Sequence, residues 1–223
     1  MSEAAHVDNR LLFGGAALAA GLLSFLLIIL ATSPAPRAPA ELLPYLEAHR
    51  PAYMLTATAA LLWVCTGIPF IVGLGALLGG ARPVLARAAE LLAAGGVLLL
   101  GVATFATVGA FLALSAAGRL APAPAESTYL AAVLSNLSFF LSDPGLMTLG
   151  FGQLLFASLA WRGGVFPRLL SAIGYAGGLA GLLTLAVYQT SVLALVQIGA
   201  LGVWGIATGI ILLRARPARP LRT

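Results

Sequence analysis

The chain has 223 residues, of which 61% are hydrophobic and 9% carry a charge, and its mean hydropathy is +1.03. A soluble domain carries about 25% charged residues, so this chain has too little polar surface to face water. The composition therefore predicts a polytopic membrane protein. All twelve basic residues are arginines, scattered over loops and the C-terminal tail. That scatter indicates membrane orientation rather than nucleic-acid binding.

Several classes of chemistry are disfavoured by what the sequence lacks. The single cysteine, Cys65, excludes an internal disulfide and a Cys-x-x-Cys redox pair. His6 and His49 lie outside the apolar runs, so we expect no haem, copper or zinc centre within the membrane. The chain also has no paired carboxylates of a di-iron site and no Ser/His/Asp set or phosphate-binding glycine loop. We therefore predict no cofactor and no metal, and we favour a protein that is not an enzyme.

Six apolar segments predict six transmembrane helices, each near the roughly 20 residues that a helix needs to cross a bilayer. The first follows Arg10 and is too long for the core of a signal peptide, so we interpret it as a retained helix. Pro69 is expected to kink the second. Glu90 falls in the first turn of the third, where it can meet Arg87 one turn earlier. The predicted spans are residues 11–31, 53–78, 91–114, 144–161, 169–188 and 192–213.

Two shorter helices are predicted outside these spans. Residues 39–47 have the pattern of an amphipathic helix at the membrane interface, and residues 129–141 form a helical piece before the fourth span. Asp143 and Pro144 then have the pattern of a helix start, with Asp143 as N-cap and Pro144 at the first helical position. The prediction is thus a single all-α transmembrane bundle over residues 1–223, with six transmembrane helices and an extra interfacial or re-entrant helix before the fourth span.

The distribution of arginine predicts how the helices are oriented. An even number of spans puts both termini on one side of the membrane. With the N-terminus inside, the inner segments hold nine of the twelve arginines and the outer segments hold three. Basic loops stay in the cytoplasm. We therefore expect a multi-pass protein of a bacterial cytoplasmic (inner) membrane with both termini in the cytoplasm.

Asp143 has long apolar runs on both sides, and two interpretations of it stay open. A carboxylate at the centre of a bilayer costs about 2.5–3.5 kcal/mol and usually marks a functional site. As an N-cap near the interface, it would only satisfy the free amides of the helix that it begins. In the functional interpretation, a discontinuous helix lines a cavity. The candidate ligand or cavity residues are Asp143, Asn136, Ser142, Gln153, Tyr175 and Gln197.

Glycines recur at four-residue spacing in the last two spans, as in Gly174/Gly178, Gly177/Gly181 and Gly205/Gly209. Small residues at this spacing let membrane helices approach closely. We favour packing within the bundle as their role, and dimerisation through these faces is the alternative.

Two inner loops carry a resemblance to a known family. Residues 82–94, with Arg82-Pro83-Val84 followed by Leu-Ala and Leu-Leu-Ala-Ala, resemble a passage of a family of uncharacterised bacterial six-helix membrane proteins, known only as a domain of unknown function. The loop at residues 161–170 is similar to that family's short loop, with an aromatic residue, Arg, Gly, Pro and a basic residue before a glycine-rich helix. Gly95 and Gly96 depart from the more polar region expected there. The resemblance implies a six-helix bundle and no established activity.

Three classes of function follow. The favoured hypothesis is a non-enzymatic membrane protein that binds or moves a small lipophilic molecule or a lipid within the helix bundle. The second is a non-catalytic accessory subunit of a larger membrane complex, whose glycine faces contact partners. An intramembrane enzyme is the third and needs a catalytic set that the sequence lacks. The expected partners are membrane lipids and, as alternatives, a second copy of the chain or another membrane subunit, with no nucleic acid.

Overall fold

The computed structural model describes residues 3–30, 48–80, 82–117, 125–186 and 191–214, and this part of the chain is helical, without strands. The prediction of an all-α protein is confirmed. The predicted interfacial helix at residues 39–47 lies outside the described residues. The helices are α1 (Glu3–Leu30), α3 (Arg50–Leu78), α4 (Pro83–Ala117), α5 (Ala125–Gly163), α6 (Arg168–Ala186) and α7 (Ser191–Arg214).

Five of these helices are long and apolar enough to cross a membrane by length and composition, namely α1, α3, α4, α5 and α7. Helix α6, with 19 residues, is not among the five. In a hydrocarbon layer every backbone polar group must be bonded within the protein, and a long apolar helix achieves this within its own segment. The coarse prediction of a multi-pass membrane protein is therefore supported, and among the described residues five helices, not six, have the length and hydropathy of a span.

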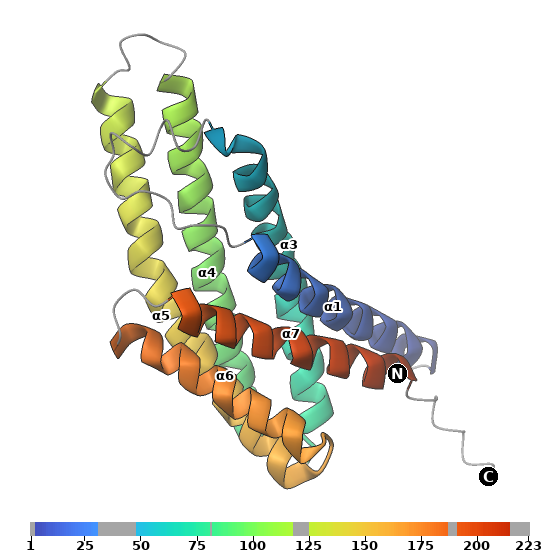
Figure 1. Ribbon diagram of the computed structural model, residues 1–223. Coiled ribbons are helices and arrows are strands. Elements are labelled where there is room, and N and C mark those ends of the chain that lie inside the picture. Colours follow the sequence, from blue (N-terminus) through green and yellow to red (C-terminus); the bar gives the residue numbers. More distant parts are fainter. Residues whose placement is uncertain (1–2, 31–47, 81, 118–124, 187–190, 215–223) are drawn as a thin grey trace, which may run out of the picture.

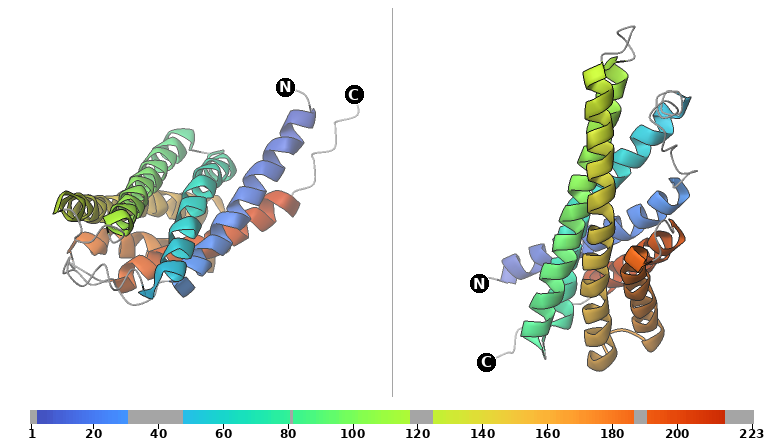
Figure 2. Two further views of the ribbon diagram at one scale, coloured as in Figure 1. Left: turned by 90° about the horizontal axis from the view of Figure 1, so that it is seen from above. Right: turned by 90° about the vertical axis from the view of Figure 1, so that its left-hand side faces the viewer.

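The helices form two groups that cross each other (Figure 1). Helices α4 and α5 pair along their length, and their upper halves extend beyond the ends of α1, α6 and α7. Helices α1 and α7 lie side by side at an oblique angle to this pair, with α1 packed on α3 and α7 packed on α6 (Figure 2). The apolar core lies where the groups meet, with Phe70 and Leu74 of α3, Phe156 of α5 and Trp204 of α7 all buried.

Glycine contacts hold several helix pairs together. A methyl group built at Gly150 of α5 would lie 2.8 Å from the carbonyl oxygen of Gly178 in α6. One built at Gly205 of α7 would lie 2.7 Å from the carbonyl oxygen of Ala17 in α1. Any side chain larger than hydrogen would push these backbones apart. The glycines of the last two spans therefore serve packing inside the protein, as favoured from the sequence.

The predicted break before the fourth span is wrong. Helix α5 runs unbroken through Pro144, so Asp143 is not an N-cap and residues 129–141 are not a separate helix. A proline removes one backbone hydrogen bond, whereas ending a helix in lipid leaves a full turn of groups unpaired, and neighbouring helices make proline tolerable there. Gly145 packs directly on Gly96 of α4 and fixes the helix at this point.

A second correction concerns the start of the third span. Helix α4 begins at Pro83, not near residue 91, so Glu90 lies in its second turn. The expected ion pair between Arg87 and Glu90 is confirmed. Glu90 also lies over Gly75 of α3, and its side chain is only 13% exposed.

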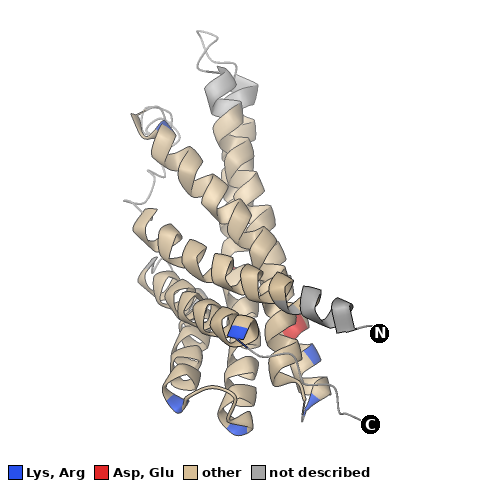
Figure 3. Ribbon diagram, turned by 90° about the vertical axis from the view of Figure 1, so that its right-hand side faces the viewer, with Lys and Arg blue, Asp and Glu red and all other residues tan. Residues whose placement is uncertain are grey.

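Charged residues gather at one end of the molecule (Figure 3). The α3–α4 turn, the α5–α6 turn and the end of α7 all meet there, next to the described ends of the chain. Arg50, at the start of α3, lies at the opposite end. We call the end where these segments meet the charged end, and its arginines are Arg82, Arg87, Arg162, Arg168 and Arg214.

Candidate functional site

The polar residues singled out from the sequence divide into two separate groups. Gln153, Tyr175 and Gln197 lie where α5, α6 and α7 meet. Asn136 and Asp143 lie toward the outer side of α5, together with Ser142, whose hydroxyl donates to the carbonyl of Ser138 in the same helix at 2.8 Å. The structure therefore does not bring the six candidates into one site.

Gln153 is a buried amide without a partner. Its side chain is 1% exposed, and neither its nitrogen Nε2 nor its oxygen Oε1 has a hydrogen-bond partner. Gly177 of α6 makes room for it, because a methyl group there would lie 2.5 Å from Nε2. A buried polar group left unpaired costs about 1–3 kcal/mol. Gln153 is thus held in place by packing alone.

Gln197 is also fully buried and is only partly satisfied. Its Nε2 donates to the carbonyl oxygen of Leu146 in α5 at 2.9 Å, while Oε1 has no partner. The side chain packs against Gly181 of α6, one turn beyond the Gly177 that receives Gln153. The two glutamines therefore fill successive gaps in the glycine face of α6.

Tyr175 makes a conventional contact between helices. Its hydroxyl lies 2.9 Å from the hydroxyl of Ser158, which links α6 to α5. The indole of Trp204 in α7 donates to the carbonyl of Leu170 in α6 at 2.7 Å. These two bonds tie α6 to its neighbours.

Two buried hydroxyls were missed by sequence reasoning. Ser171 of α6 and Thr208 of α7 are both fully buried, and neither hydroxyl oxygen has a partner. The sequence held one sign that Thr208 is buried. Its spacing from Gln197 and Trp204, by eleven and four residues, places all three on one face of a helix. An isolated Ser or Thr in an apolar run gives no such signal alone.

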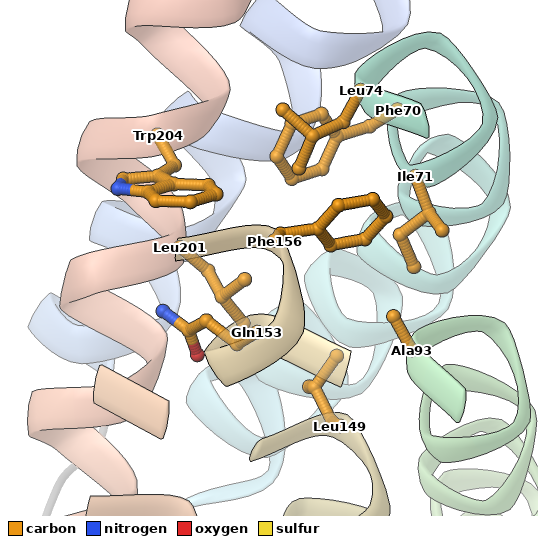
Figure 4. Close-up of a pocket in the computed structure, with 9 residues that line it drawn as sticks. All are labelled: Phe70, Ile71, Leu74, Ala93, Leu149, Gln153, Phe156, Leu201 and Trp204. Atoms are coloured by element: carbon orange, nitrogen blue, oxygen red, sulfur yellow. The ribbon is translucent and has the colours of Figure 1, made fainter. Parts of the chain in front are cut away.

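A small cavity lies beside Gln153, where α3, α4, α5 and α7 meet (Figure 4). Its volume of about 10 Å³ is room for about one water molecule. Phe156 and Leu149 project from α5 into this region, while the amide of Gln153 points toward α7. The lining residues are Phe70, Ile71, Leu74, Ala93, Leu149, Gln153, Phe156, Leu201 and Trp204.

The second group occupies what we call the outer face of α5, defined by Tyr129, Val133, Asn136, Phe140 and Asp143. Their spacings of three and four residues place them on one side of the helix. Phe140 is 77% exposed and Tyr129 is 74% exposed. Asn136 is exposed and Asp143 is partly exposed, and neither side chain has a polar partner among the described residues. This face combines apolar area with two unpaired polar groups.

The described part of the chain holds no group of three or more His, Cys, Asp or Glu side chains that could bind a metal ion. The candidate residues supply amides, hydroxyls and one carboxylate, which can bind polar groups by hydrogen bonds.

Comparison with known proteins supports the resemblance noted in the sequence. A family model described as Domain of unknown function (DUF4386) matches residues 12–215. The chain belongs to this family. Searches of curated proteins and of solved structures found no match. Membership of the DUF4386 family brings no established activity.

Proposed function

We propose that this protein is a non-enzymatic membrane protein of the bacterial inner membrane that binds a lipid or other small lipophilic molecule on the outer face of α5. The observation that carries the proposal is the unpaired Asp143 beside the exposed Phe140. The sequence alone suggested a ligand within the bundle. The cavity beside Gln153, with a volume of about 10 Å³, is too small for such a molecule, whereas the unpaired Asp143 lies on the outer face of α5.

The position of Asp143 along α5 suits the headgroup of a lipid. Arg162, at the charged end, lies 19 residues further along this helix, which corresponds to about 28 Å. The hydrocarbon layer is about 30 Å thick, so Asp143 comes close to its opposite border. Apolar surface continues below it with the exposed Phe151, where an acyl chain can lie.

The outer face of α5 favours a headgroup that can donate a hydrogen bond. A carboxylate accepts hydrogen bonds and attracts positive charge, so the fitting headgroup carries an ammonium or a hydroxyl. Asn136 lies two turns away, about 10 Å along the helix, and its amide can bond a second headgroup oxygen. An ethanolamine phospholipid has this pattern, whereas a choline phospholipid has the same charge without an N–H donor.

The test compares the retention of these two lipids after reconstitution and detergent extraction, by native mass spectrometry. We expect the ethanolamine lipid to be retained over the choline lipid, and Asp143→Leu to abolish the preference. Thr58→Val is a matched control, because Thr58 is exposed on α3 and its hydroxyl bonds its own helix. Equal retention of both lipids by the unaltered protein would refute the proposal.

The second candidate is an accessory subunit of a membrane complex. It is favoured by the large exposed side chains on the halves of α4 and α5 that lie away from the charged end, such as Phe105, which is 64% exposed. A partner helix with a donor would then satisfy Asp143. Copurification of one subunit at fixed stoichiometry, lost in Asp143→Leu, would favour this candidate over lipid binding.

The proposal includes a membrane topology with six crossings. We take α6 as a sixth crossing, because its 19 residues reach about 28 Å and the ends of α1 and α7 lie at one end of the molecule. The basic end then faces the cytoplasm. Reporters fused after Thr223 and within residues 82–87 should both report a cytoplasmic position, and a periplasmic signal from either would exclude this arrangement.

A further inference from the structure

A concentration of unpaired polar atoms marks the contact between α5, α6 and α7, which we call the seam. Within the described part of the chain, five buried side-chain atoms have no hydrogen-bond partner. All five belong to these three helices: two atoms of Gln153, one of Gln197, and the hydroxyls of Ser171 and Thr208. The remaining buried polar side chains that the structure describes, Ser24 and Thr184, both bond within their own helices.

The groups of the seam follow one another along α6. Ser171 is part of α6 itself, Gln153 packs at Gly177, and Gln197 packs at Gly181. The last spacing is four residues, or about one helical turn. The seam is therefore a row of neutral amides and hydroxyls along α6, with the indole of Trp204 packed on Gly174 between Ser171 and the two glutamines.

We propose that the seam binds water. Water is the smallest neutral molecule with both donor and acceptor groups, and these amides and hydroxyls offer both. Buried polar groups are ordinarily bonded to protein or to ordered water. The residues of the row are neutral and offer no charge to pair with that of an ion. This inference is independent of lipid binding on the outer face of α5.

Water enters when α6 moves away from α5 and α7. The cavity beside Gln153 has a volume of about 10 Å³, too small to serve five atoms. Helix α6 presents glycines to the two amides, so no α6 side chain interlocks with them. The bonds that must adjust are the one from Trp204 to Leu170 and the one between Tyr175 and Ser158.

Thiol accessibility tests the proposal in reconstituted protein with Cys65→Ser as background. We expect Thr208→Cys and Ser171→Cys to react with a small water-soluble methanethiosulfonate at least tenfold faster than Ala157→Cys. Ala157 is a fair control because it is fully buried in the apolar core. Equal rates at all three positions would contradict a hydrated seam, as would no reaction at the two polar positions.

Two further measurements guard against variants that misfold. Adding Gln153→Met to Thr208→Cys should slow the labelling several-fold without lowering the melting temperature, because the thioether fills the same space without needing water. A lower melting temperature with unchanged labelling would mean that the amide is bonded in a dry interface. In the unaltered protein, magnetisation transfer from water should reach the side-chain amides of Gln153 and Gln197 in solid-state NMR, and its absence would overturn the proposal.

Discussion

Asp143 and Gln153 belong to the same helix, ten residues apart, and their surroundings are opposite. Asp143 is partly exposed on the outer face of α5, while Gln153 is 1% exposed within the seam. At 3.6 residues per turn, ten residues rotate a side chain by about 80° around the axis. That rotation is enough to turn one polar group toward lipid and the other toward α6 and α7. Polarity alone therefore does not identify an interior site in a membrane helix.

Replacing a residue has different energetic consequences in the seam and on the outer face of α5. A group in the seam is packed on several helices, so its replacement disturbs shape as well as hydrogen bonding. A group on the outer face has room around it, so its replacement changes what the protein can bind more than how stably it folds. Variants in the two regions should therefore separate stability from binding.

The largest effect is expected for Gln197→Ala. The change removes the bond to Leu146 and leaves a gap against Gly181. Truncating large buried side chains costs about 2–5 kcal/mol. On the outer face, Asn136→Ala should stay within about 0.5 kcal/mol. Thermal unfolding of both purified variants checks this, and similar losses for the two would erase the distinction between the regions.

The next effect is expected for Gly150→Ala, where the added methyl group meets the backbone of α6. Overpacking of this kind costs about 1–3 kcal/mol. Gly15→Ala is the matched control, because nothing lies within 4 Å of a methyl group at that position of α1. The control should gain about 0.5–1 kcal/mol from the better helix propensity of alanine. Melting temperatures that move in the same direction would contradict the close contact of α5 with α6.

A smaller loss is expected for Tyr175→Phe, which removes only the hydroxyl that contacts Ser158. Hydrogen bonds between membrane helices average about 0.6 kcal/mol. A double-mutant cycle with Ser158→Ala measures the pair directly. The Ser158→Ala change should cost little more once Tyr175 is already Phe, and additive losses would mean that the two hydroxyls do not interact.

The smallest effect is expected at Asp143. An N-cap would lose about 0.5–2 kcal/mol on replacement by alanine, but α5 continues through this position. Alanine is a better helix former than aspartate by up to about 0.7 kcal/mol, so Asp143→Ala should melt at the same temperature or slightly higher. A clear loss of stability would restore the capped, broken helix predicted from the sequence.

Pro144 and Glu90 illustrate why boundaries were hard to predict. The Asp-Pro-Gly pattern favours a helix start in water, where free amides bond to solvent. In lipid the helix continues through the same pattern, because ending it would leave several backbone groups without hydrogen bonds, whereas the proline removes only one. For α4 the start was placed too late: the arginines at 82 and 87 suggested a basic turn before the span, yet α4 begins at Pro83, and Arg87 pairs with Glu90 within the helix.

The sequence by itself predicted a membrane protein built of helices, because a chain with 9% charged residues has too little polar surface for water and its long apolar runs can bond their own backbone groups as helices. It also determined the family and the glycine spacings that allow close packing. Only the tertiary structure decided which polar residues face inward, since this depends on the rotation of each helix against neighbours far away in the chain. For this reason Ser171 and Thr208 lie with the two glutamines in the seam, while Asp143 lies on the outer face of α5.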